Sequence, residues 1–175
     1  MNTTEVLAHF EESANYYLQE LNGYSIEQLV SQPGENEWSM GQMIQHLINS
    51  SINMSLRNID YCLTQDDNSV VSTGEKTEAG QALMDQGGFP PIRIQVPASP
   101  QYTPGQPESK EQLVQGLNTV ISRMKEVESM LEQAPLHNTI AHPRFGGLNA
   151  KEWFMLVEMH FRHHLLQWNR LKQSL

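Results

Sequence analysis

Cysteine is almost absent from this sequence, in which Cys62 is the only one among 175 residues. A single cysteine cannot form an intramolecular disulfide, and one chain cannot build a Cys-based zinc or iron–sulfur site from it. Its position well inside a predicted helix also argues against a role as a nucleophile. Nothing in the sequence therefore requires an oxidising compartment.

Long apolar runs and clusters of basic residues are also missing. No run approaches the roughly 18 apolar residues of a membrane span. The first eighteen residues include Glu5, Glu11 and Glu12 and lack the basic and apolar regions of a secretory signal, so we expect a cytoplasmic protein. The 20 Asp and Glu against 11 Lys and Arg give a formal net charge of −9, which argues against nucleic acid or an anionic membrane as the partner. We expect a small-molecule substrate, or another protein, instead.

What the sequence does contain is helical periodicity. Four stretches place apolar residues on one face of a long helix: 3–21, 39–65, 109–131 and 149–172. A shorter helix is expected at about residues 25–33. Ser39, Ser109 and Asn149 each precede a Gln or Glu by three residues, which is the capping pattern of a helix start. These features predict an all-α helical bundle that forms one domain over residues 1–175.

Residues 66–107, between the second and third long helices, show no helical periodicity. They hold six of the nine prolines and five of the eleven glycines, which predicts a long and mostly non-helical connection. Its length suits a crossover along the bundle, so these two helices need not be antiparallel neighbours. Ile92, Ile94 and Val96 alternate with polar residues and predict an extended segment packed on a helix surface.

Two histidines lie in the apolar stripe of the fourth long helix. His160 and His164 are four residues apart, so their imidazoles project side by side and can bind one divalent ion. Core histidines satisfied by hydrogen bonds are the alternative, although each unmatched buried ring would cost about 1–3 kcal/mol. Glu158, Arg162 and Asn169 fall on the opposite side, which we expect to face solvent.

A third ligand has to come from elsewhere in the chain. His46 lies at the edge of the apolar arc of the second long helix, and the small Ser50 one turn later would leave room for a water. His9, His137 and His142 are expected to be solvated surface or loop residues. The sequence has no His-Glu-x-x-His and no Glu-x-x-His at these positions, which excludes zincin and di-iron patterns. A mononuclear site with mostly nitrogen ligands is what remains.

Four segments together resemble the DinB/YfiT-like superfamily of metal-dependent enzymes: residues 38–47, 142–148, 153 and 160–167. The match spans essentially the whole chain. It implies a closed four-helix bundle with up-down-down-up topology, the long connection lying between its second and third helices, and often a homodimer. Characterised members of that superfamily include thiol transferases that use low-molecular-weight thiols such as bacillithiol or mycothiol, and a thiol-dependent isomerase.

The resemblance also implies roles for particular residues. The superfamily's histidine pattern carries over onto His46, His160 and His164 as ligands of a divalent metal ion, with zinc or nickel expected. His163 and Gln167 recur in such sequences, and we interpret them, with Ser50, as pocket residues or as partners of the ligating imidazoles. The alternative for His163 and Gln167 is an ordinary place on the helix surface.

Trp38, Trp153 and Trp168 are expected to be core residues rather than pocket residues. Aromatic side chains of this size bury a large apolar area, so most of them contribute to the packing of a domain.

The leading functional hypothesis is a metal-dependent enzyme that activates a thiol or water, as a thiol transferase or a hydrolase, with a low-molecular-weight thiol as a candidate cofactor. The alternative is a non-catalytic helical bundle that binds a metal or ligand and acts as a dimeric interaction protein. Met155, Met159 and Leu166 motivate this alternative, because they form an apolar strip that the connection or a second subunit must cover.

Overall fold

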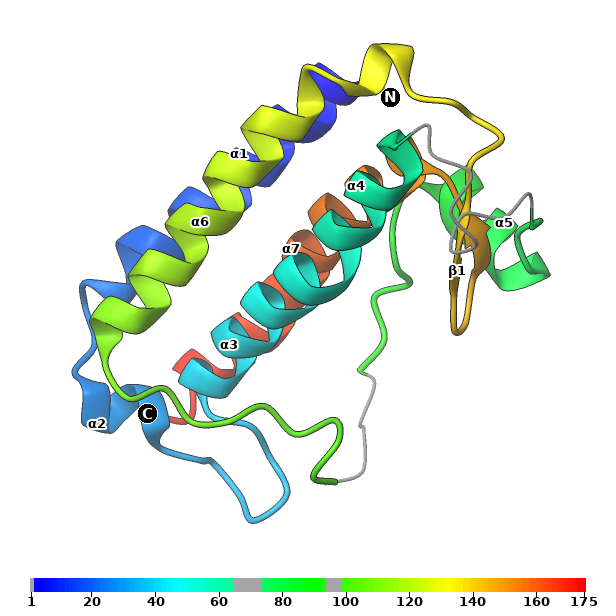
Figure 1. Cartoon of the computed structure of the whole chain (residues 1–175). Helices are drawn as coiled ribbons and strands as arrows, with labels where there is room; N and C mark the ends of the chain where they lie inside the picture. The colour runs from blue at the N-terminus through cyan, green and yellow to red at the C-terminus, as the bar shows by residue number, and fades with distance from the viewer. Residues whose placement is uncertain (1, 65–73, 94–98) are drawn as a thin grey trace.

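The computed structural model describes residues 2–64, 74–93 and 99–175, and it is mostly helical, as predicted (Figure 1). The α-helices are α1 (Thr3–Leu21), α2 (Ile26–Val30), α3 (Met40–Ser50), α4 (Arg57–Leu63), α5 (Glu78–Gln86), α6 (Lys110–Glu128) and α7 (Ala150–Lys172). A π-helical turn, η1 (Ser51–Leu56), joins α3 to α4, and a 3-10 turn, η2 (Leu131–Gln133), follows α6. Two short strands, β1 (Ile140–His142) and β2 (Gly146–Leu148), pair antiparallel before α7.

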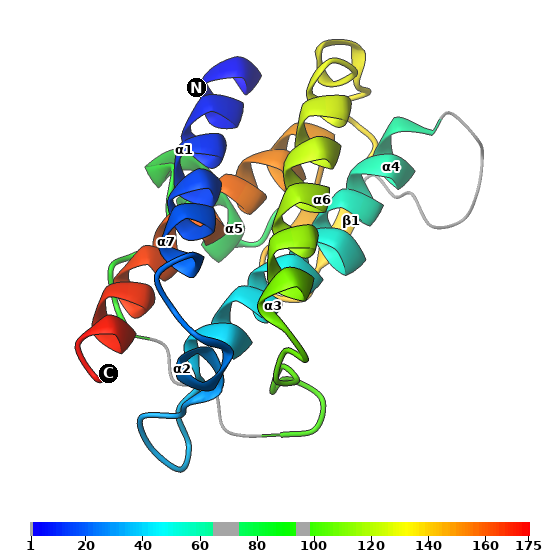
Figure 2. The same ribbon diagram turned by 90° about the vertical axis from the view of Figure 1, so that its left-hand side faces the viewer.

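Four long helical segments make up the bundle: α1, α3 continued through η1 into α4, α6 and α7 (Figures 1 and 2). In Figure 1, α1 and α7 run from the top of the view to the bottom, whereas the α3–α4 segment and α6 run upward. α1 packs against both α6 and α7. These directions are compatible with the up-down-down-up order, which stays a prediction here.

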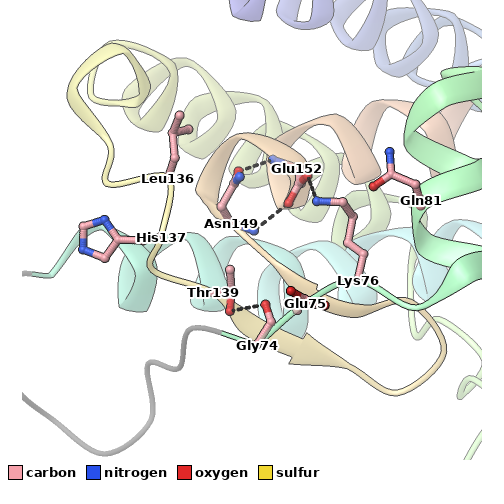
Figure 3. Close-up of a pocket in the computed structure, with 10 residues that line it drawn as sticks. Gly74, Glu75, Lys76, Gln81, Leu136, His137, Thr139, Asn149 and Glu152 are labelled. Carbon is pink, nitrogen blue, oxygen red and sulfur yellow. Dashed lines mark hydrogen bonds and ion pairs between the residues drawn. The ribbon is translucent and has the colours of Figure 1, made fainter.

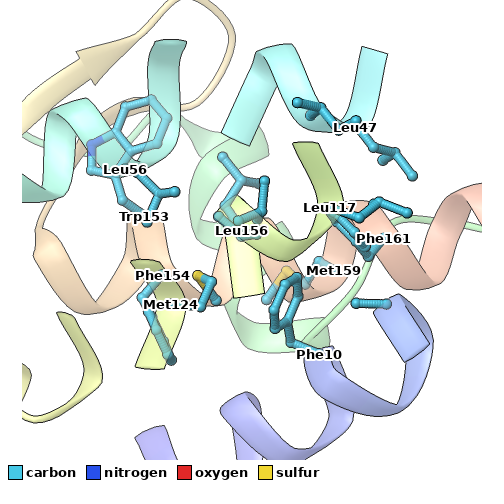
Figure 4. Packing of buried hydrophobic residues seen from close by; sticks show 14 of the residues in the cluster. Phe10, Leu47, Leu56, Leu117, Met124, Trp153, Phe154, Leu156, Met159 and Phe161 are labelled. Carbon is cyan, nitrogen blue, oxygen red and sulfur yellow. The ribbon is translucent and has the colours of Figure 1, made fainter. Parts of the chain in front are cut away.

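The core fills the space between these helices with large apolar side chains (Figure 4). The Phe10 and Phe161 rings meet edge to face with their centroids 4.9 Å apart, and the Tyr17 hydroxyl donates to the Phe161 carbonyl at 2.8 Å. Trp153 and Trp168 are fully buried, as expected. Full burial of each large apolar side chain contributes about 1.5–3 kcal/mol, so these contacts fix α7 against α1.

The predicted helix starts are correct. The side chains of Ser39, Ser109 and Asn149 each accept a hydrogen bond from the backbone N–H three residues later. Such a cap satisfies one of the donors that a helix leaves unpaired in its first turn. Capping therefore sets where α3, α6 and α7 begin.

The second long helix is not a regular α-helix throughout. The π-helical turn over Ser51–Leu56 has more residues per turn than an α-helix and so shifts the phase of the side chains. Ser51 and Ser55 are buried, whereas Ile52, expected in the apolar seam, is only half-buried. The predicted end of this helix at residue 65 lies outside the described residues.

The long connection contains a helix that the sequence analysis did not predict. α5 begins after Thr77, whose side chain caps it, and ends at Gly87, which has the left-handed φ of 65°. Beside α5, the Thr77 N–H donates to the Phe145 carbonyl at 2.9 Å and the Gly147 N–H donates to the Glu75 carbonyl at 2.8 Å. The connection is therefore hydrogen-bonded to the β1–β2 hairpin.

The extended segment expected around Ile92, Ile94 and Val96 falls largely outside the described residues, since residues 94–98 are not described. Ile92 itself is 57% exposed, so it is not packed as predicted. The described part of the connection instead contributes α5 and residues 87–93, which lie beside the α3–α4 and α7 pair, on the side away from α1 and α6 (Figures 1 and 2).

Glu158 is buried at 2% exposure, so its expected place on the solvent face was wrong. The Arg162 Nε donates to its carboxylate at 2.7 Å, and the Arg162 Nη2 donates to the Gly87 carbonyl at 2.7 Å. The connection covers this side of α7, which a helical wheel drawn for one helix cannot reveal. The ion pair with Arg162 compensates the charge of the buried Glu158 carboxylate.

Most of the expected apolar strip of α7 is also covered within a single chain. Met159 is buried and Met155 is half-buried against the core, whereas Leu166 is 53% exposed. The strip therefore leaves no continuous apolar face on α7 for a partner, and only Leu166 still needs an explanation.

Candidate metal centre

Three histidines from two helices meet at one point beside the core. The Nε2 atom of His160 lies 2.9 Å from the Nε2 atom of His46 and 3.0 Å from the Nε2 atom of His164. All three nitrogen atoms lie within 4.8 Å of one another. α7 supplies His160 and His164 from adjacent turns, and α3 supplies His46 from across the bundle.

Hydrogen bonds among the three rings cannot account for this arrangement. The Nε2 atom of a neutral imidazole carries either one hydrogen or one lone pair. The Nε2 atom of His160 therefore can make one proper hydrogen bond, although two other Nε2 atoms lie at hydrogen-bond distance. One cation among the three nitrogen atoms would use every lone pair.

The spacing fits such an ion. Imidazole nitrogens bind a divalent ion at about 2.0–2.1 Å, which sets two ligating nitrogens roughly 2.9–3.4 Å apart for ligand angles between about 90° and 110°. The two Nε2 separations, 2.9 and 3.0 Å, lie at the short end of this range. His46, His160 and His164 are the group that could hold a metal within the described residues, and all three offer nitrogen donors.

Burial keeps the three rings neutral, which is the form that binds metal. Desolvation lowers the pKa of His46 to about 4 and the pKa of His164 to about 3. The pKa of His160 falls well below its usual value for the same reason, with the neighbouring histidines as a further cause. Neutral imidazoles bring no negative charge, so an ion bound here would keep its full charge.

Two of the rings have a partner at the second nitrogen. The Nδ1 atom of His164 lies 2.8 Å from the Gln167 Oε1, which can only accept, so Nδ1 carries the hydrogen and Nε2 keeps its lone pair. The Ser50 hydroxyl donates to the His46 carbonyl at 2.7 Å and lies 3.3 Å from the His160 Nδ1. Ser50 and Gln167 thus contact the second ring nitrogens of two of the three histidines.

The cluster opens into a cavity of about 760 Å³, bounded by α3, α7, the loop before α3, the connection and the hairpin loop. Trp38 lines this cavity, with its ring 5.0 Å from that of His46, so its expected place in the core was wrong. Trp38 precedes the capping Ser39 and therefore lies outside the buried face of α3. His163 lines the same cavity, 5.3 Å from the Phe89 ring.

His142 is the cavity residue that the sequence analysis missed. It was expected to be solvated, but it lies on β1, stacks on Phe145 at 4.5 Å and lines the cavity. Its Nδ1 accepts from the backbone N–H groups of Arg144 and Phe145 at 3.0 and 3.3 Å, so the hydrogen of the neutral ring is on Nε2. The signal was the tight turn between two short strands, which places His142 over α7.

The other histidines and the cysteine that the sequence offered as functional residues do not line this cavity. His9 and His137 are exposed, as expected. Cys62 is fully buried, and burial raises the pKa of its thiol to about 11, which agrees with a structural role.

A second, smaller cavity of about 380 Å³ lies beside His137 and the start of α7 (Figure 3). Three of its polar side chains are paired with one another: Lys76 binds Glu152 at 2.6 Å, and Glu152 exchanges capping hydrogen bonds with Asn149. These pairs link the connection to the first turn of α7, so we assign this cavity a structural role rather than a ligand-binding one.

Comparison with solved structures identifies a match over almost the whole chain. The crystal structure of TT2238, a four-helix bundle protein, superimposes with a TM-score of 0.59 and covers 97% of this chain and 99% of its own, at 17% sequence identity. At this identity the match supports the four-helix bundle fold alone. Within the described residues, no helix is long and apolar enough to cross a membrane.

Comparison with sequence families identifies the superfamily of this chain. No curated protein matches the chain significantly. The model of the DinB superfamily matches residues 9–168, which include every residue of the histidine cluster. The chain therefore belongs to the DinB superfamily, as its sequence motifs predicted.

Proposed function

We propose that this protein is a metal-dependent enzyme, built on an up-down-down-up bundle, in which His46, His160 and His164 hold one divalent ion. The observation that carries the proposal is the meeting of three neutral Nε2 atoms around His160. Hydrogen bonding cannot satisfy them together, whereas a cation can. Zinc and nickel are the metals we expect, since both accept imidazole ligands.

A bound ion of this kind supplies Lewis acidity, which lowers the pKa of a water or thiol beside it to near neutrality. The protein supplies the rest. Gln167 and Ser50 orient two of the imidazoles through their second nitrogen atoms. The apolar cavity wall, which includes Phe89, Phe145 and Leu156, limits the access of bulk water to the nucleophile.

Of the two nucleophiles, we favour a low-molecular-weight thiol over water, because the characterised members of the superfamily that this chain resembles include thiol transferases. In such a reaction the thiolate sulfur attacks an electrophilic carbon, a carbon–sulfur bond forms, and the leaving group departs with its electron pair. The thiol proton passes to solvent. The substrate is then a small molecule, and we propose a cytoplasmic homodimer as the working form.

Elemental analysis tests the metal site. The wild type, purified without a chelator or a polyhistidine tag, should contain about one divalent ion per chain. His46→Ala and His160→Ala should each lose it, because two imidazoles bind more weakly than three. His9→Ala and His137→Ala are matched controls, since both side chains are exposed. A folded wild type that contains no metal after incubation with zinc or nickel would contradict the proposal.

A second assay separates the two nucleophiles. The metal-loaded protein is incubated with 1-chloro-2,4-dinitrobenzene and a low-molecular-weight thiol, and separately with p-nitrophenyl acetate without thiol. Thiol-dependent release of chloride that is lost in His160→Ala supports transfer. Ester hydrolysis that needs the metal but no thiol favours the hydrolase instead.

A further inference from the structure

Arginine side chains gather in the wall of the large cavity, although the protein as a whole is acidic. The chain has a net charge of −9, yet the cavity is lined by Arg93, Arg144 and Arg170. Among the described residues that line it, Glu37 is the one acidic residue. The cavity wall thus has the opposite charge to the rest of the molecule.

The three arginines differ in what they bind. The Arg93 Nη2 donates to the Glu37 Oε1 at 2.9 Å, so these two charges compensate each other. The Arg144 guanidinium lies over the Phe145 ring, 5.7 Å from its centroid. Arg170, on α7, interacts electrostatically with Glu37 and Arg93, but within the described part of the chain it makes no ion pair within 4.0 Å and no side-chain hydrogen bond, and its buried Nε has no partner there. A buried donor without an acceptor costs about 1–3 kcal/mol.

The rim of the same cavity carries exposed apolar side chains. Ile92, Tyr102 and Leu166 line it and are 57%, 62% and 53% exposed. They come from three separate segments, two from the connection and one from α7. Apolar side chains that remain exposed around one cavity are typical of a ligand site. This grouping also accounts for Leu166, which nothing in the described chain covers.

Arg170 lies at a distance from the histidine cluster that one small ligand could span. It follows His164 by six residues on α7, which corresponds to about 9 Å along the helix axis. A ligand of roughly that length, held at one end by Arg170, would therefore bring its other end to the histidine cluster.

We propose that this cavity binds a small anion with an apolar body, whose anionic group is held by Arg170 and whose apolar part contacts Ile92, Tyr102 and Leu166. The planar guanidinium offers paired donors that fit a carboxylate, phosphate or sulfonate. This inference gives the substrate class of the proposed enzyme and rests on that proposal in treating the cavity as the active site. The binding itself needs no metal.

Two fluorescent probes with one skeleton test the proposal. 8-Anilinonaphthalene-1-sulfonate carries an anionic group, and N-phenyl-1-naphthylamine lacks it. In Arg170→Gln, the affinity for the sulfonate should fall about tenfold or more, because a hydrogen bond to a charged group is lost. The affinity for the neutral probe should change less than twofold. Arg57→Gln is the matched control, because Arg57 is exposed on α4 and its substitution removes the same charge away from the cavity.

Competition then identifies the anion. 1-Naphthoate and 1-naphthyl phosphate should both displace the sulfonate probe, and the anion that fits the arginine better should do so at the lower concentration. The neutral 1-naphthamide should need a concentration at least about tenfold higher, because it makes only the apolar contacts. Equal losses for both probes in Arg170→Gln, or equal losses of sulfonate binding in Arg170→Gln and Arg57→Gln, would overturn the proposal. Running each titration on chelator-treated and metal-loaded protein keeps the outcome separate from that of the metal assay.

Discussion

The Nε2 atoms of His46 and His160 lie 2.9 Å apart, although 114 residues separate the two histidines in the chain. They belong to different helices, and α4, the long connection, α6 and the hairpin lie between those helices in the sequence. Their approach therefore depends on how α3 and α7 pack. The same pair makes the site sensitive to any change that moves either helix.

The Gln167 side chain should control metal affinity through His164. Its Oε1 accepts from the His164 Nδ1 at 2.8 Å, which orients the ring and raises its basicity. Gln167→Met keeps the length but removes the acceptor, so we expect metal affinity to fall about 10- to 100-fold. Gln167→Glu should retain or increase it. Competition with a coloured chelator measures both affinities, and Gln19→Met, on the exposed side of α1, is the control that should match the wild type.

The Tyr17 hydroxyl should stabilise the contact between α1 and α7 without affecting the metal. It is buried and donates to the Phe161 carbonyl at 2.8 Å. Tyr17→Phe should lower the free energy of unfolding in urea by about 1 kcal/mol. Tyr61→Phe, at a 39% exposed position, should change it by much less. Loss of metal from Tyr17→Phe would show that this contact positions His160, contrary to our expectation.

Gly80 is where α5 lies against the hairpin. A Cβ at this position would lie 2.2 Å from the Phe145 carbonyl oxygen, a backbone atom that cannot move without moving the hairpin. We expect Gly80→Ala to destabilise the protein by about 1–3 kcal/mol, as overpacking does. Gly105→Ala is the control, because a Cβ there meets nothing within 4 Å. Thermal unfolding of the two variants at one pH measures the difference.

His142 should make stability depend on pH. Burial of the ring, and to a lesser degree the positive Arg144, lower its pKa to about 4. Below about pH 6.5 the unfolded chain binds a proton at His142 that the folded protein does not, so the free energy of unfolding falls as the pH falls from 6.5 towards 4. His160 is the other titratable group that interacts with this ring electrostatically.

His142→Gln removes this effect. Between pH 7 and 4.5, metal-free wild type should lose more stability than the variant, by on the order of 2 kcal/mol once partial exposure of the ring is allowed for. Urea unfolding at the two pH values measures it. His9→Gln, at an exposed histidine, should follow the wild type. Parallel pH profiles for His142→Gln and wild type would disprove the assignment.

Local sequence predicted the helical elements well. The starts of α3, α6 and α7 follow from capping residues, whose hydrogen bonds span only three residues. Periodicity also placed His160 and His164 on one face, because neighbours four residues apart always adjoin on a helix. Membership of the DinB superfamily was predicted from motifs along the chain and is confirmed.

What the sequence could not determine depends on contacts between distant segments. The burial of Glu158 depends on cover by the connection, and the place of His142 in the cavity depends on the hairpin. The π-helical turn, which packs against α6 and α7, was not predicted either. The helix α5 was not predicted because only two of its nine residues, Gly80 and Leu83, are buried, which is too few to give a helical periodicity in the sequence. Arg170 looks like an ordinary helix-end cation in sequence, and only the tertiary structure shows that it lines the cavity and that its Nε has no hydrogen-bond partner among the described residues.

The sequence by itself therefore determined the long helices, their starts and the pair of histidines on α7, since these follow from interactions over a few residues, and its motifs indicated the family. The resemblance named His46 as the third histidine, but only the tertiary structure shows it beside the pair and decides which side chains surround the three rings. Those outcomes depend on the crossing of α3 and α7 and on the cover provided by the connection, which are set by the burial of apolar surface over the whole chain.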